Sequence, residues 1–176
     1  MSNEQLWAPW RLGYILGKDL PLPKEIGPLL PGADADCFLC QCVPEGHDRS
    51  RLVVDRGEHT FTVLNRYPYN NGHVLIAPKR HIGTLDELDD AEQIEMSLTM
   101  TRMVRTLGKL IQPHGYNIGL NLGQAAGAGV PGHLHWHIVP RWSGDTNFMS
   151  SVAGIRTIPQ SLEALWDLLA EALGKR

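Results

Sequence analysis

Three histidines that alternate with apolar residues restrict the fold more than any other feature of this sequence. The segment reads Gly132-His133-Leu134-His135-Trp136-His137-Ile138-Val139-Pro140-Arg141. Residues i, i+2 and i+4 of a β-strand project from the same face. We therefore predict a strand over 133–139 with three imidazoles on one face, about 6–7 Å apart, and apolar side chains facing the core. An exposed edge strand would tolerate such a face, but Thr, Ser or Lys would serve it equally well, so we expect imidazole chemistry here.

The periodicity of the remaining chain predicts an α+β fold. Short β-rich segments predict strands over 51–55, 59–64, 73–77 and 116–122. Asp89 with Glu92 predicts the start of a long helix that ends before Pro113, and residues 159–161 start a last helix. The long helix carries an apolar stripe of Met96, Met100, Met103, Leu107 and Leu110, widened by Ile94 and Leu98; the last helix carries Leu162, Leu165, Leu169 and Ala172. This order predicts an antiparallel sheet of about five strands with a long helix and a C-terminal helix.

Composition limits the class of protein. The 176 residues include 16 Lys and Arg against 19 Asp and Glu, a formal charge of −3, and are 43% hydrophobic. This balance argues against nucleic acid or an anionic membrane as a partner, and no apolar run approaches the ~18 residues that span a bilayer. Three cysteines argue against a disulfide framework. We expect a soluble, cytoplasmic protein with a Pro/Gly-rich arm over 1–36 and a single domain over 37–176.

The alternating histidines are compatible with two chemistries. They could hold a zinc ion that activates water, or present a neutral imidazole as a nucleophile flanked by imidazoles that orient and protonate. The preceding loop, residues 123–132, is rich in glycine and alanine. Its backbone N–H groups, including those near Gly127 and Gly129, suit phosphate oxygens, which favours nucleophilic attack on phosphorus.

The sequence also resembles the histidine triad family. Residues 133–139 fit its signature His-φ-His-φ-His-φ-φ, where φ is apolar. The resemblance extends over about residues 37–149 through the segments 63–68, 71–78, 117–123 and 140–149. It is greatest to the branch that contains the fragile histidine triad proteins and bacterial diadenosine tetraphosphate phosphorylases, and residues 7–11 (Trp-Ala-Pro-Trp-Arg) are similar to the bacterial members.

This resemblance implies an activity and roles for individual residues. His135 would attack the α-phosphorus of a dinucleoside polyphosphate, forming a nucleotidyl-histidine that orthophosphate or water then discharges. His137 would contact the non-bridging oxygens, with His133 as the third member of the triad. Asn65 would hold the ribose hydroxyls, Asn121 would lie near the α-phosphate, and His73 would orient a neighbour. The resemblance further implies a homodimer and a small-molecule nucleotide substrate, and no organic cofactor. Arg141 is a further candidate for a phosphate contact because it lies close to the triad.

A pair of cysteines adds a candidate metal site. Cys37-Phe38-Leu39-Cys40 has the spacing of a zinc knuckle, but such a pair alone is compatible with zinc, a redox pair or chance. Some relatives bind structural zinc with such a pair and two histidines. The matching residues are Cys37, Cys40, His81 and His133, a closed site in which Zn²⁺ would stabilise the fold and fix His133 without performing the chemistry.

One departure from the family leaves the acceptor open. Many members carry Gln-Ser or Gln-Thr just before the triad, where this chain has Gly129-Val130-Pro131-Gly132. Leaving-group contacts must then come from backbone N–H groups or elsewhere, and Gln124 is a weak candidate. Other functions stay open: a nucleotide sensor with little turnover, a zinc hydrolase that uses the triad, or a hydrolase of nucleoside phosphoramidates or aminoacyl-adenylates. A uridylyltransferase is disfavoured because that branch has Gln where this chain has His137.

Overall fold

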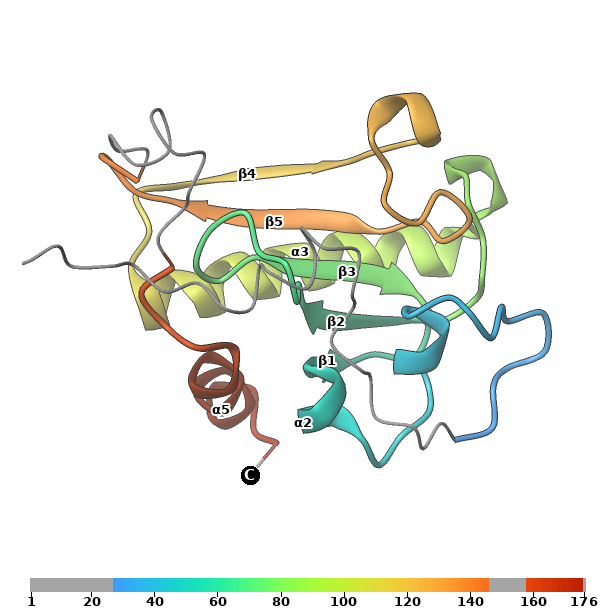
Figure 1. The fold of residues 1–176 in the computed structure, drawn as a ribbon, viewed down its shortest axis with the longest axis horizontal. Helices are drawn as coiled ribbons and strands as arrows, with labels where there is room; N and C mark the ends of the chain where they lie inside the picture. Colours follow the sequence, from blue (N-terminus) through green and yellow to red (C-terminus); the bar gives the residue numbers. More distant parts are fainter. Residues whose placement is uncertain (1–26, 146–157, 176) are drawn as a thin grey trace, which may run out of the picture.

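A five-stranded antiparallel sheet organises the computed structural model, which describes residues 27–145 and 158–175 (Figure 1). The strand order is β1-β2-β3-β5-β4. The bounds are β1 Val53–Arg56, β2 Thr60–Leu64, β3 Val74–Pro78, β4 Gly115–Leu120 and β5 Trp136–Arg141. The predicted fold class is therefore confirmed.

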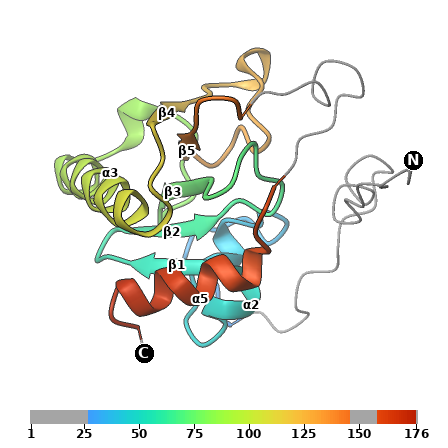
Figure 2. The same ribbon diagram turned by 90° about the vertical axis from the view of Figure 1, so that its left-hand side faces the viewer.

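Two capped helices flank this sheet. Helix α3 spans Asp90–Ile111 and is capped by Asp89. The Asp89 side chain accepts from Glu92 N, while the Glu92 carboxylate accepts from Asp89 N. Helix α5 spans Leu162–Ala172 and is capped by Ser161, whose hydroxyl accepts from Ala164 N. Shorter helical turns complete the described chain: η1 Cys40–Cys42, α2 Asp48–Arg51, η2 Leu85–Glu87 and η3 Gln124–Ala126. Figure 2 shows α3 on one side of the sheet, α2 on the other and α5 beside β1.

The register of β5 assigns its side chains to the two faces. Tyr116 pairs with Pro140, and the Tyr116 hydroxyl donates to Val104 O of α3, so these residues face the helix. His137 is one residue out of phase with this set and pairs with Leu75 and Gly119. Side chains alternate along a strand, so His137 projects from the face opposite α3.

The core confirms most of the predicted apolar stripe and corrects part of it. Met96, Met103 and Leu107 are buried between α3 and the sheet, whereas Ile94 and Leu98 are 61% and 65% exposed. Ile94 and Leu98 each lie two positions from a core residue, about 200° around the helix, so they face away from the sheet. On α5, Leu165 and Leu169 are buried, but Ala172 is exposed.

Two predicted strand starts, at residues 51 and 133, differ from the structure by more than one residue, and each for a physical reason. Arg51 belongs to α2, and Leu52 adopts a left-handed conformation (φ 62°) before β1 begins. Strand β5 begins only at Trp136, because the pairing with β3 starts at Ile76 opposite Trp136. His133 and His135 therefore precede the ladder. The prediction that three imidazoles form one row on a strand is wrong.

Two further predictions concern the arm and the surroundings of the protein. Residues 1–26 of the predicted arm lie outside the described residues, and residues 27–36 contain turns without a helix or strand. Within the described residues, no helix has the length and apolarity needed to cross a bilayer. The cytoplasmic location and the single-domain boundaries stay predictions.

Candidate active site and metal cluster

A pocket of about 810 Å³ lies on the face of the sheet to which His137 points. Most of its lining comes from four stretches: Asp34 and Asp36–Phe38, Asn65 with Tyr67–Tyr69, Asn121 with Gly127, and Gly129–Gly132 with His135 and His137. The pocket thus brings together six of the residues predicted for catalysis or nucleotide binding: Asn65, Asn121, Gly127, Gly129, His135 and His137. Two of the predicted metal ligands, Cys37 and His81, also line it. His133 and His73 do not line it.

His135 presents its Nε2 atom for chemistry. Its ring is 7% exposed, and Nδ1 lies 2.8 Å from His133 O. A carbonyl oxygen only accepts, so Nδ1 carries the proton and Nε2 carries the lone pair. Burial lowers the pKa of His135, which keeps the ring neutral. A neutral imidazole whose remaining nitrogen faces a pocket is a competent nucleophile.

His137 presents the opposite group, a proton on Nε2. The backbone N–H of Tyr69 donates to His73 Nδ1 at 3.0 Å, so the proton of His73 is on Nε2. His73 Nε2 lies 2.9 Å from His137 Nδ1, which must accept, and this places the His137 proton on Nε2. That nitrogen is buried without a hydrogen-bond partner among the described residues. Burial, and secondarily the charge of His135, lowers the pKa of His137 from 6.5 to about 4.

The Asn65 amide reinforces the same proton order. Asn65 Oδ1 accepts from Tyr67 N at 2.9 Å, and Asn65 Nδ2 lies 3.2 Å from His73 Nδ1. The second hydrogen of Nδ2 and the second lone pair of Oδ1 remain for a ligand. Asn65 therefore both supports His73 and borders the pocket.

The glycine-rich loop forms the wall before the histidines. Asn121 Nδ2 donates to Gly127 O at 3.3 Å, and Gly127 has a left-handed conformation (φ 83°) that side chains disfavour. A Cβ atom on Gly132 would lie 3.2 Å from His81 Nε2, so the loop packs closely on the His81 segment. Gln124 lies in η3 and does not line the pocket.

A second cluster, which we term the Cys/His cluster, consists of Cys37, Cys40, His81 and His133. One ligand atom from each residue lies within 4.8 Å of the other three. His133 Nδ1 is 3.4 Å from both sulfurs, and His81 Nδ1 is 3.2 Å from Cys40 Sγ. Zn–S and Zn–N bonds of about 2.3 and 2.0 Å place tetrahedral ligand atoms roughly 3.5 Å apart. The distances and the donor set therefore fit a structural zinc site.

Hydrogen bonding orients His133 towards the two cysteines. His133 Nε2 lies 2.9 Å from Pro78 O and must donate to it, so the lone pair is on Nδ1 and faces the sulfurs. The ring is fully buried, and burial lowers its pKa to about 4. Both ring nitrogens are thus engaged away from the pocket. This geometry favours a metal role for His133 over contact with a substrate, and it separates His133 from the two pocket histidines.

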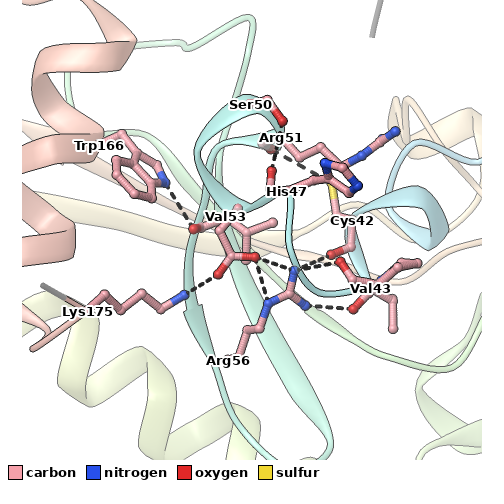
Figure 3. A network of polar contacts seen from close by, with 11 residues as sticks. Cys42, Val43, His47, Ser50, Arg51, Val53, Arg56, Trp166 and Lys175 are labelled. Carbon is pink, nitrogen blue, oxygen red and sulfur yellow. Dashed lines mark hydrogen bonds and ion pairs between the residues drawn. The ribbon is translucent and has the colours of Figure 1, made fainter. Parts of the chain in front are cut away.

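Polar contacts anchor each half of the Cys/His cluster. Arg56 of β1 donates to the carbonyls of Cys42, Val43 and Pro44 at 2.7 to 3.1 Å and to Asp48, which also binds Lys175 (Figure 3). These bonds tie the segment after the cysteines to the sheet and to the end of α5. On the other half, Arg80 pairs with the buried Glu92 of α3 and holds the segment of His81.

Two site assignments from the sequence need correction or extension. Arg141 pairs with Asp145 and Asn117 and does not line the pocket, so the structure does not support it as a phosphate contact. Tyr69 was missed, although its ring stacks on His137 with centroids 5.9 Å apart and an interplanar angle of 17°. The signal was the pair of tyrosines on either side of Pro68 in 65–72, a segment that otherwise predicts only a loop.

The chain is similar to known proteins in sequence and in fold. The family model of the HIT domain matches residues 48–144. The AP-4-A phosphorylase of Mycobacterium tuberculosis is 38% identical over 167 residues, covering 95% of this chain and 83% of that protein. A zinc-bound histidine triad family protein from Mycobacterium smegmatis is 29% identical with a TM-score of 0.58, covering 70% of this chain and 84% of the other. A hypothetical histidine triad nucleotide-binding protein from Sulfolobus tokodaii is 25% identical with a TM-score of 0.62, and the match covers 79% of this chain and 93% of the other.

The chain belongs to the HIT family, as the match of more than half its length shows. The predicted family membership is confirmed.

Proposed function

We propose that this protein is an enzyme that cleaves dinucleoside polyphosphates, with diadenosine tetraphosphate or triphosphate as substrate. The observation that carries the proposal is the pair of complementary imidazoles in one pocket: a lone pair on His135 Nε2 beside a proton on His137 Nε2. The similarity to a mycobacterial AP-4-A phosphorylase supports this class of substrate.

In the first step His135 Nε2 attacks the α-phosphorus, and the bond from that phosphorus to the bridging oxygen of the leaving nucleotide breaks. The nucleotidyl-imidazole carries a positive charge, which the bond from Nδ1–H to His133 O stabilises. In the second step an oxygen of orthophosphate or water attacks the same phosphorus, the P–N bond breaks and His135 is restored. Orthophosphate yields ADP and ATP from diadenosine tetraphosphate, and water yields AMP and ATP.

His137 stabilises the charge that develops during both steps. Its Nε2–H is a preformed donor in a buried site, where a hydrogen bond to a phosphate oxygen contributes more than in water. His73 does not reach the pocket lining but keeps this proton on Nε2 by donating to His137 Nδ1. His73 is thus a positioning residue.

The rest of the pocket would bind the nucleotide. The unused amide groups of Asn65 can form a bidentate contact with the ribose hydroxyls. Asn121 and the backbone near Gly127 and Gly129 lie on the wall before the histidines, where they can contact the α-phosphate.

The Cys/His cluster would hold a structural zinc ion, as expected for a site in which four protein ligands fill every position around the metal. The zinc-bound relative from Mycobacterium smegmatis supports this assignment. The ion would keep both thiols deprotonated, although in its absence burial, together with the neighbouring Cys40, raises the pKa of Cys37 to about 11. His133 links the two clusters because its side chain faces the sulfurs while its carbonyl holds the proton of His135.

The protein is also proposed to form a homodimer through α3 and the edge strand β4. Ile94, Leu98 and Ile118 are 46% to 65% exposed, and β4 pairs only with β5 among the described strands. Exposed apolar side chains and an unpaired edge strand are both common features of association surfaces. The substitution Leu98→Glu should halve the mass measured by analytical ultracentrifugation, while Ala172→Glu, at an exposed position of α5 outside the proposed surface, should leave it unchanged. A monomeric wild type would refute the dimer.

Incubation with diadenosine tetraphosphate, with and without orthophosphate, tests the proposed activity. Phosphate-dependent formation of ADP and ATP indicates phosphorolysis, and AMP and ATP without phosphate indicate hydrolysis. Absence of reaction on diadenosine tetra- and triphosphate would refute the proposal. Binding without turnover would indicate a sensor, and turnover of adenosine phosphoramidate or an aminoacyl-adenylate alone would indicate the other hydrolase activity.

A further inference from the structure

Tyr69 contacts the pocket histidines in two independent ways. Its backbone N–H donates to His73 Nδ1 at 3.0 Å. Its ring lies 4.8 Å from the His73 ring and 5.9 Å from the His137 ring, nearly parallel to the latter. The side chain lines the pocket and is 49% exposed, so it covers the two histidines from the side of the solvent.

Core packing does not account for a large aromatic side chain at this position. Half of Tyr69 remains exposed. The aromatic rings that it contacts among the described residues are those of His73 and His137, which are polar side chains and not part of an apolar core. Stacking fixes a ring plane, and an aromatic cover excludes water from the face it covers. The residue therefore has the contacts expected of a group that positions His137.

We propose that Tyr69 is a positioning residue that holds His73 and His137 in the proton order required for catalysis. We name the series from Tyr69 N–H through His73 to His137 Nε2 the proton relay. The backbone of Tyr69 starts the relay by making His73 Nδ1 an acceptor, and its ring stacks on the relay's last member. The inference rests on the proposed function for its catalytic consequence, but the proton order itself can be measured without substrate.

Protonation of His137 is the event that the ring opposes. A charged His137 carries protons on both nitrogens, so its Nδ1 could no longer accept from His73 and the relay would break. The titratable groups that face His137 are His135, His73 and Tyr69, and Asp34 and Asp36 line the same pocket. Burial is the largest cause of the lowered pKa of His137. Removal of the ring would reduce that burial.

Three substitutions separate the effects of the aromatic ring, the apolar bulk and the hydroxyl of Tyr69. Tyr69→Phe keeps the ring, Tyr69→Leu keeps apolar bulk without a flat face, and Tyr69→Ala removes both. Nitrogen-15 NMR of the imidazoles reports the protonated nitrogen and the pKa of His137 in each variant, and assignment uses His137→Asn. Thermal unfolding shows that the variants are folded.

In the wild type and in Tyr69→Phe, we expect His137 to be protonated on Nε2 and to titrate near pH 4. In Tyr69→Ala the His137 pKa should rise towards 6.5, and the acid limb of kcat/KM for diadenosine tetraphosphate should move upward with it. At pH 8, kcat of Tyr69→Ala should fall about tenfold with less change in KM, since the loss is one of positioning. Tyr69→Leu should lie between these variants.

Unchanged nitrogen shifts, pKa and kcat in Tyr69→Ala would overturn the proposal. So would a loss in Tyr69→Phe as large as that in Tyr69→Ala, because the hydroxyl rather than the ring would then be responsible. If the wild type turns over no dinucleotide, the proposed function fails, while the NMR measurements still decide whether the Tyr69 ring keeps His137 neutral within the relay.

Discussion

The Cys/His cluster and the pocket histidines use the same residue type in opposite ways, although only Leu134 separates His133 from His135. His133 is fully buried, donates from Nε2 to Pro78 O and turns its Nδ1 lone pair to two sulfurs. His135 donates from Nδ1 to His133 O and keeps its Nε2 lone pair for the pocket. Backbone carbonyls, rather than the side chains themselves, therefore determine which nitrogen of His133 and of His135 can act.

The largest expected effect comes from removal of the proposed nucleophile. His135→Ala should lower turnover of diadenosine tetraphosphate by about 10⁴- to 10⁶-fold, the range seen when a covalent nucleophile is lost. Zinc content, measured by atomic absorption, should stay at the wild-type value because His135 is outside the Cys/His cluster. His114→Ala, which changes a histidine bonded to Ser143, is the control for turnover. Zinc loss in His135→Ala would contradict the separation of the two clusters.

The second test removes a ligand from the Cys/His cluster. Cys40→Ala should lose zinc and lower the free energy of unfolding by about 4 kcal/mol, the value for a ligand present at a thousand times its dissociation constant. Turnover should fall as well, because the His133 carbonyl would no longer be held beside His135. Cys42→Ala is the matched control, since this buried cysteine is not one of the four ligands. Equal zinc content in the two variants would contradict the assignment.

The third test loosens only the cysteine half of the Cys/His cluster. Arg56→Ala removes the donor to three carbonyls after the cysteines and leaves Asp48 with Lys175, so we expect a loss of about 3 kcal/mol in unfolding free energy. Zinc affinity, measured by competition with a chelator, should also weaken. Arg49→Ala breaks an exposed ion pair with Asp167 and should change stability by less than about 1 kcal/mol. Unaltered zinc affinity in Arg56→Ala would show that this anchor is irrelevant to the metal.

The smallest expected effect is a pH dependence of the unfolding free energy that arises from His137 in the pocket. The pKa of His137 is about 4 in the folded protein and 6.5 when unfolded, so the unfolded state binds more protons between these values. The stabilisation is therefore present above pH 6.5 and is lost as the pH falls towards 4, by about 1 to 2 kcal/mol after solvent screening.

Urea unfolding of the zinc-loaded protein at pH 8, 6.5, 5 and 4 measures this loss. His137→Asn should give a flatter dependence over the same range, because it removes the titrating group. Below about pH 4.5 both proteins should lose further stability, since a hydrogen bond from Arg80 lowers the pKa of the Glu92 carboxyl. Parallel curves for the two proteins above pH 4.5 would contradict the buried neutral state of His137.

The accuracy of the sequence-based predictions follows from the range of the interactions involved. The cap at Asp89 and the core positions of Met96, Met103 and Leu107 depend on neighbours within a few residues, and these were predicted correctly. The row of three histidines failed because β3 begins to pair with β5 only at Trp136, a contact about 60 residues distant in sequence. Alternation shows that a segment can be a strand, but only the partner strand determines where pairing starts.

The α+β order of elements, the histidine motif and the cysteine spacing could all be read from the sequence, because each depends on local periodicity or on residue identity. The division of the histidines between the Cys/His cluster and the pocket, in contrast, could be read only from the three-dimensional structure. That division depends on Pro78 O, on Tyr69 N–H and on the sulfurs of Cys37 and Cys40, which the fold brings from distant segments to the ring nitrogens. A ring nitrogen donates or accepts according to the partner it meets, so the proton on each histidine follows from the packing of the strands and loops around it.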